Sequence, residues 1–154
     1  MTTTSPTSDR EMAISRLIKA PRERVFDAFT DRERISEWWG PNGFTTTTSE
    51  MDVRPGGTWR FVMHGPDGTD YPNLIRYHEV VRPERLAYDH SDDEAGEIAF
   101  ASVVTFEEAE GGTLVTLRAT FATAEIRRQH AEEVGAVEGG QQTLARLAAM
   151  LEAA

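Results

Sequence analysis

Six short, strand-like segments separated by turn residues fill the middle of the chain, and they constrain the fold more than any other feature. The segments cover residues 45–53, 58–64, 71–81, 86–90, 97–106 and 113–121. Turn-forming runs such as Pro55-Gly56-Gly57 and Gly111-Gly112 stand between them. Strands that follow one another through short turns pair with their neighbours, so the sequence predicts an antiparallel meander.

Two short helices are predicted between these strands and an earlier strand at 11–19. Pro21 suits the first turn of a helix, because its missing N–H would be unpaired there anyway. Asp31 can cap a second helix, which Gly40-Pro41 ends. Apolar residues recur at helical spacing in both segments: Val25, Phe26, Phe29, Ile35, Trp38 and Trp39. Adjacent helical residues point about 100° apart, so we expect one tryptophan in the core and the other at a cavity mouth or an oligomer contact.

The C-terminal segment is predicted to be a long helix that packs on the sheet. An apolar stripe recurs there at spacings of three and four: Val137, Gly140, Leu144, Leu147 and Leu151. A charged lead-in at 123–134 is also helix-prone, and Gly135 is expected to bend or separate the two parts. The fold class is therefore α+β.

The composition and charge of the chain limit where the protein can act and what it can bind. The 154 residues fit one domain at 9–154, preceded by a disordered arm at 1–8. A formal net charge of −10 disfavours nucleic acid, and no apolar stretch is long enough to insert in a membrane. The start of the chain does not read as a secretory signal, so we expect a cytoplasmic protein.

Four runs of sequence resemble the Hsp90-ATPase-activator-homologue branch of the START and pollen-allergen-like (SRPBCC) superfamily. They are KAPRERVFDAFTDRERISEWWGPNGF, MDVRPGGTWRFVMHGPDG, EVVRPERLAY and GAVEGGQQTLARLAAML. The resemblance implies a helix-grip fold, in which a bent antiparallel sheet of six or seven strands surrounds a long C-terminal helix, with two short helices after the first strand. It also implies an internal cavity for a small apolar or amphipathic ligand. Relatives often carry a large aromatic residue at the position of Gly140.

On this basis, residues from the two short helices, the sheet and the long helix are expected to contact the ligand. Trp59, Phe61 and Met63 share one face of a strand at period two, and that face is either core or cavity wall. Gly140 leaves either an unfilled volume or a close contact between helix and sheet. The full predicted set is Trp39, Trp59, Phe61, Met63, Tyr77, Tyr88, Gly140 and Leu144.

Polar residues on the strands are the remaining candidates for chemistry: Arg76, Tyr77, Glu79, Tyr88 and His90. Facing Val81 with Arg85 would set His78 near Tyr88, but a slip of one residue near Pro83 would move Tyr88 and His90 to the other face together. The strand histidines fall at different heights, so no metal site is predicted.

The leading hypothesis is therefore a ligand-binding domain to which no reaction and no cofactor is assigned. The sequence favours a protein without catalytic activity over an enzyme. A cyclase or dehydratase using the same cavity, or a chaperone-interacting domain, are the alternatives. They differ in what they require: an enzyme needs two converging ionisable groups in the pocket, and an interaction module needs a large exposed apolar patch. The sequence is also compatible with a homodimer.

Overall fold

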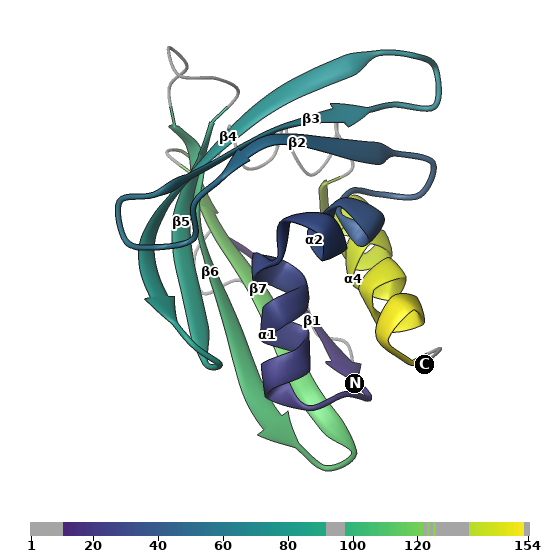
Figure 1. Cartoon of the computed structure of the whole chain (residues 1–154), viewed down its shortest axis with the longest axis vertical. Coiled ribbons are helices and arrows are strands. Elements are labelled where there is room, and N and C mark those ends of the chain that lie inside the picture. Colours follow the sequence, from purple (N-terminus) through teal and green to yellow (C-terminus); the bar gives the residue numbers. More distant parts are fainter. Residues whose placement is uncertain (1–10, 92–97, 122, 124, 126–135, 153–154) are drawn as a thin grey trace.

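A seven-stranded antiparallel sheet bends around the three helices of the described residues in the computed structural model of the chain (Figure 1). The structure describes residues 11–91, 98–121, 123, 125 and 136–152. The expected N-terminal arm and most of the predicted lead-in helix lie outside these residues. The strands are β1 (Glu11–Ile18), β2 (Thr45–Met51), β3 (Thr58–His64), β4 (Asp70–Val81), β5 (Arg85–Ser91), β6 (Ile98–Ala109) and β7 (Gly112–Phe121). The helices are α1 (Arg22–Thr30), α2 (Arg32–Trp38) and α4 (Ala136–Glu152).

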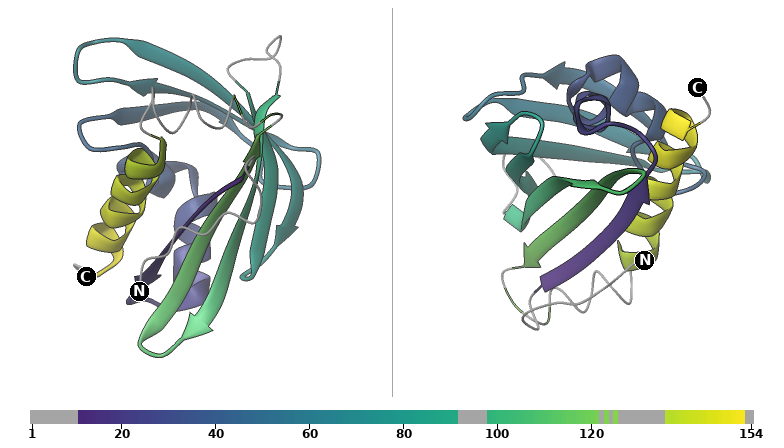
Figure 2. Two further views of the ribbon diagram at one scale, coloured as in Figure 1. Left: turned by 180° about the vertical axis from the view of Figure 1, so that it is seen from behind. Right: turned by 90° about the horizontal axis from the view of Figure 1, so that it is seen from below.

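The order of strands across the sheet is β1-β7-β6-β5-β4-β3-β2. Strands β2 to β7 therefore form the predicted meander, and β1 joins its far edge by pairing with β7, with Ile14 opposite Leu117. The helices lie on the inner side of the bend, and α4 packs against β1 (Figure 2). This arrangement confirms the predicted α+β helix-grip fold.

The two short helices begin and end near their predicted limits. Asp31 caps α2, because its side chain accepts hydrogen bonds from the backbone N–H groups of Glu33 and Arg34. Pro21 is the N-cap residue of α1 rather than its first residue. Phe26 and Phe29 of α1 meet the ring of Phe106 edge to face, with centroids 5.3 and 5.1 Å apart. These contacts hold α1 against β6.

Helix α4 buries the three leucines of the predicted stripe, whereas the burial of Val137 lies outside what the structure describes. Leu144, Leu147, Ala148 and Leu151 are all buried in the core, whereas Gln141, near the start of the helix, is exposed. The core continues across the inner face of the sheet through Ile18, Val104, Val115 and Leu86. The helix therefore closes the interior that the bent sheet leaves open.

Strand β4 departs from regular pairing at His78. Val81 faces Arg85 as expected, but a β-bulge between Tyr77 and Glu79 leaves His78 without an opposite residue. Tyr77, rather than His78, is therefore the residue opposite Tyr88. The bulge keeps Tyr77 buried while His78 and Glu79 are both exposed.

Candidate functional site

A pocket of about 270 Å³ lies between the inner face of the sheet and the start of α4. We call it the inner pocket. Its walls are largely apolar and come from β1, the segment after α2, four further strands and α4. The described residues that line it are Met12, Ile14, Trp39, Gly40, Pro41, Met63, Tyr88, His90, Phe100, Ser102, Leu117, Arg118, Ala119, Phe121, Gly139, Gly140 and Thr143.

The inner pocket lies where small residues meet on both of its walls. On the sheet, Ala119 of β7 lies opposite Ser102 of β6. Two residues away along β7, larger side chains follow on either side: Leu117 in one direction and Phe121, which lies opposite Phe100, in the other. On the helix side, Gly139 and Gly140 contribute no side-chain volume. Large neighbours surround this small-residue strip and hold its walls apart, so the hollow follows from the register of the sheet.

Tyr88 and Ser102 are two residues with hydroxyl groups that line the inner pocket. The residues face each other across β5 and β6, and both are buried. Burial raises the pKa of Tyr88 to about 12, and the nearby Ser102 hydroxyl offsets only part of that rise. The phenol is therefore protonated at neutral pH and acts as a hydrogen-bond donor or acceptor.

His90 is held at the pocket wall by Asn73 and by two aromatic rings. Its Nε2 lies 2.7 Å from Asn73 Oδ1, and the Asn73 Nδ2 donates to the carbonyl of Tyr71 at 2.8 Å. Because Nδ2 is used as a donor, Oδ1 must accept from His90, so Nε2 carries the proton. The ring stands 4.7 Å from that of Phe100 and 6.1 Å from that of Phe61, centroid to centroid. The imidazole is thus fixed in orientation and in tautomer.

The two adjacent tryptophans divide as the sequence predicts. Trp38 is buried in the core, and its indole N–H donates to the carbonyl of Ala28 at 3.0 Å. Trp39 ends α2, is only partly buried and lines the inner pocket. Its ring stands edge to face on Trp59 at 5.1 Å between centroids. Trp39 therefore links the aromatic core to the pocket wall.

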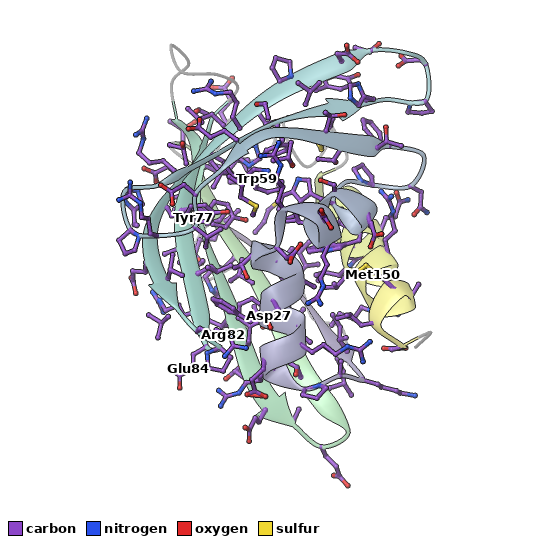
Figure 3. The ribbon with its side chains drawn as sticks, in the orientation of Figure 1. Asp27, Trp59, Tyr77, Arg82, Glu84 and Met150 are labelled. Carbon is purple, nitrogen blue, oxygen red and sulfur yellow. The ribbon has the colours of Figure 1, made fainter. Side chains whose placement is uncertain are left out.

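Four of the eight predicted ligand contacts line the inner pocket: Trp39, Met63, Tyr88 and Gly140. The other four are almost fully buried within the core: Trp59, Phe61, Tyr77 and Leu144. Trp59 and Phe61 stack on each other with centroids 3.9 Å apart. Figure 3 labels Trp59 and Tyr77 on the sheet, and the void beside these two residues measures only about 10 Å³. A void of that size holds about one water molecule at most.

The remaining polar candidates separate by face. Tyr77, Tyr88 and His90 point inward, whereas Arg76 and Glu79 are exposed. His78 is also exposed and bonds Asp89 at 2.6 Å, away from the inner pocket. Within the described ranges, no group of three His, Cys, Asp or Glu side chains could hold a metal ion.

A second polar cluster lies on the outer face of the sheet, where the pairing of β3 with β4 sets His64 opposite Asp70. His64 Nδ1 is 2.7 Å from Asp70 Oδ1, and His64 Nε2 is 2.8 Å from Thr47 Oγ1. The order of hydroxyl, imidazole and carboxylate resembles that of a catalytic triad. However, these side chains are exposed on neighbouring strands and none of them lines the inner pocket. We interpret the cluster as a cross-strand tie between β2, β3 and β4.

Reading the sequence did not identify several residues of the pocket wall. Met12, Ile14, Leu117, Phe100 and Phe121 were assigned to strands but not to a site. The signal that could have found the pocket is the pair of small residues, Ala119 and Ser102, within otherwise bulky strands. That signal becomes informative only when the register across β6 and β7 is known.

Comparisons with known proteins agree with this architecture. The family model described as "Activator of Hsp90 ATPase homolog 1-like protein" matches residues 19–152. A solved structure of a protein from Mycobacterium smegmatis is 27% identical, with a TM-score of 0.85, and the match covers 98% of this chain and 97% of that one. A structure from Nitrosomonas europaea is 26% identical, with a TM-score of 0.86 and coverage of 96% and 97%. No curated protein matches the chain. Within the described residues, no helix is both long enough and apolar enough to cross a membrane.

Proposed function

The chain belongs to the family of Activator of Hsp90 ATPase homolog 1-like proteins, and on this premise we propose that it binds a small, mainly apolar molecule in the inner pocket. The observation that carries the proposal is a pocket of about 270 Å³ with apolar walls and a few converging polar groups. Small-molecule sites are typically apolar hollows of about 300–1,000 Å³ in which a few polar groups orient the ligand. The volume favours a compact ligand rather than a long lipid.

The character of the lining distinguishes the inner pocket from larger depressions on the surface. One depression of about 640 Å³ is lined mainly by charged side chains, among them Glu23, Asp27 and Arg34. Water solvates such walls well, so an apolar molecule gains little by entering it. Burial of the same molecule in the inner pocket removes apolar surface of both partners from water.

Catalysis is less well supported than binding, because an acid–base enzyme needs ionisable groups that exchange protons near neutral pH. Of the described residues that line the inner pocket, Tyr88, His90 and Arg118 are ionisable. The raised pKa of Tyr88 keeps its proton in place. Arg118 forms an ion pair with Glu11 at 3.0 Å. His90 is then the single described group suited to proton transfer, and a cyclase or dehydratase would need a second.

A chaperone-interacting role is also less well supported by the surface. In the part of the chain that the structure describes, Tyr71 and Val81 are the large hydrophobic residues that are well exposed. They stand at opposite ends of β4 and do not form a continuous apolar patch. We propose that the protein binds its ligand in the cytoplasm.

The test is uptake of a neutral apolar fluorophore, N-phenylnaphthylamine, by the wild type and two matched variants. Ala119→Phe places a ring in the floor of the inner pocket. Ala101→Phe places the same ring on the exposed outer face of the neighbouring strand. We expect the wild type and Ala101→Phe to bind equally and Ala119→Phe to bind at least about tenfold more weakly. Equal binding by all three folded proteins would place the site elsewhere.

A further inference from the structure

The hydroxyls of Tyr88 and Ser102 form a pair that can recognise a particular kind of polar group. Both residues line the inner pocket, both are buried, and they face each other across β5 and β6. The Ser102 hydroxyl is near enough to the phenol to favour its ionised form, although burial outweighs this effect on the pKa of Tyr88. Ser102 also lies opposite Ala119, which lines the same pocket.

The Tyr88 and Ser102 hydroxyls have a hydrogen-bond donor that no described group uses. Each hydroxyl has one hydrogen to donate, and a bond between the two hydroxyls would use only one of these hydrogens. The structure gives neither hydroxyl a hydrogen bond to another group among the described residues. Buried donors in proteins are almost always satisfied by protein or water. At least one hydrogen is therefore available to an acceptor on a molecule inside the pocket.

The charges around the pocket indicate that this acceptor is neutral. Arg118 is the one Lys or Arg among the described lining residues, and its guanidinium is paired with Glu11 and 41% exposed. The Nε2 proton of His90 is committed to Asn73. A carboxylate would lose its hydration on entering and would find no unpaired Lys or Arg among the described lining residues to compensate. A ketone, ester or amide oxygen loses less hydration and needs only one donor.

We propose that the inner pocket selects uncharged apolar molecules that carry a carbonyl-type acceptor, and that the Tyr88–Ser102 pair donates the hydrogen bond that recognises it. This inference rests on the proposed binding function and adds the chemical class of the ligand. The other lining residues then contribute to binding through the shape of the pocket and through apolar contact. Thr143 serves as an internal comparison, because its hydroxyl already donates to the Gly139 carbonyl at 2.8 Å.

The test compares three probes of nearly the same shape, with their substituents at the same ring position: acetylnaphthalene, isopropylnaphthalene and naphthoate. Affinities are measured by calorimetry and by quenching of tryptophan fluorescence. We expect the wild type to prefer acetylnaphthalene over isopropylnaphthalene by about tenfold and to bind naphthoate most weakly. Each single variant, Tyr88→Phe or Ser102→Ala, retains one hydroxyl. The double variant should therefore show the full loss of the preference, with unchanged affinity for isopropylnaphthalene.

The control is Thr143→Val, which removes a pocket hydroxyl that is already bonded and should leave the preference for the ketone intact. Equal wild-type affinity for the ketone and the hydrocarbon would overturn the inference and leave the binding function standing. Tightest binding of naphthoate would overturn the selection against charge. Exclusion of all three probes and of N-phenylnaphthylamine would overturn the proposed function and the inference with it.

Discussion

A Cβ atom added at Gly140 would overlap the Cδ1 atom of Ile14, so α4 and β1 meet at Gly140 with no side chain on the helix side of the contact. The sequence left open whether this glycine marks an unfilled volume or a close approach between helix and sheet. The structure shows the close approach, and both residues also border the inner pocket. The contact and the pocket edge are therefore the same place in the molecule.

Gly140→Ala should reduce ligand binding more than it reduces stability. Alanine is better than glycine in a helix by about 1 kcal/mol. The atom that must yield is the end of the flexible Ile14 side chain, which can turn into the adjacent hollow. We expect the free energy of unfolding to change by less than about 1 kcal/mol, while the affinity for N-phenylnaphthylamine falls. Chemical denaturation and probe titration measure the two effects.

Gly139→Ala is the matched control for this change. Its new Cβ would make only ordinary contacts with Pro41, at 3.7 and 3.8 Å, so it gains helix propensity without displacing Ile14. Adding Ile14→Val to Gly140→Ala removes the displaced atom and should restore binding. A loss of stability above about 3 kcal/mol in Gly140→Ala would show that Ile14 cannot move.

Leu144→Ala should destabilise the protein by about 2–5 kcal/mol, because it opens a cavity under α4. Leu144 is 1% exposed and belongs to the core stripe. Gln141→Ala, at an exposed position of the same helix, should change stability by less than about 0.5 kcal/mol. Equilibrium denaturation of the two variants measures the difference. If both midpoints equal that of the wild type, the helix does not close the core.

Much of the fold could be predicted because the local signals agree with one another. Strand β3 has its predicted limits, and Asp31 caps α2 as its position suggests. The bulge at His78 could not be predicted, because nothing in the local sequence distinguishes a residue that is skipped in pairing from its neighbours. That bulge decides which residues of β4 lie opposite Tyr88 and His90. Their inward orientation therefore had to come from the structure.

The site was harder to predict than the fold, because core and pocket wall share one face of the sheet. Trp59 and Phe61 have the same alternation as Met63, yet the first two stack within the core and only Met63 reaches the inner pocket. These residues differ in their position in the folded protein. Their distance from α4 and from the Ala119–Ser102 pair decides which of them reaches the pocket. Periodicity specifies the face of a strand, and it does not specify which part of that face is covered.

The buried tyrosines should make the protein less stable at alkaline pH. In the unfolded chain a tyrosine releases its proton near pH 10, whereas burial raises the pKa of Tyr88 to about 12. Between these values the unfolded state holds fewer protons than the native state, so stability falls as pH rises, by about 1.4 kcal/mol per pH unit for one such group. Burial raises the pKa of Tyr77 as well, which adds to the effect.

Tyr88→Phe should therefore flatten this dependence. Denaturant midpoints of the wild type and the variant, measured between pH 8 and pH 11, should diverge in slope only above about pH 10. Tyr77→Phe should act in the same direction. Parallel curves for the wild type and both variants would show that these phenols are not buried as the structure has them.

Arg146 should be needed both for stability and for ligand binding, because it fastens the segment after α2 to α4. Its Nη1 donates to the carbonyls of Gly40, Pro41 and Phe44 at 2.9, 3.1 and 3.1 Å, and its Nη2 donates to that of Glu37 at 3.3 Å. A helix leaves carbonyl groups unpaired at its C-terminal end, and a cation there is favourable. Gly40 and Pro41 also line the inner pocket, so the arginine positions part of its wall.

Arg146→Lys keeps the charge but replaces the planar guanidinium with a single ammonium, which cannot reach all four carbonyls in the same geometry. We expect a loss of about 1–3 kcal/mol in the free energy of unfolding, together with weaker uptake of N-phenylnaphthylamine by the folded protein. Arg32→Lys is the control, because the exposed Arg32 bonds the carbonyl of Thr48 at 2.8 Å away from the pocket. It should change stability by less than about 0.5 kcal/mol and leave uptake unaltered. Unaltered uptake in Arg146→Lys would mean that the segment from Gly40 to Phe44 keeps its place without the arginine.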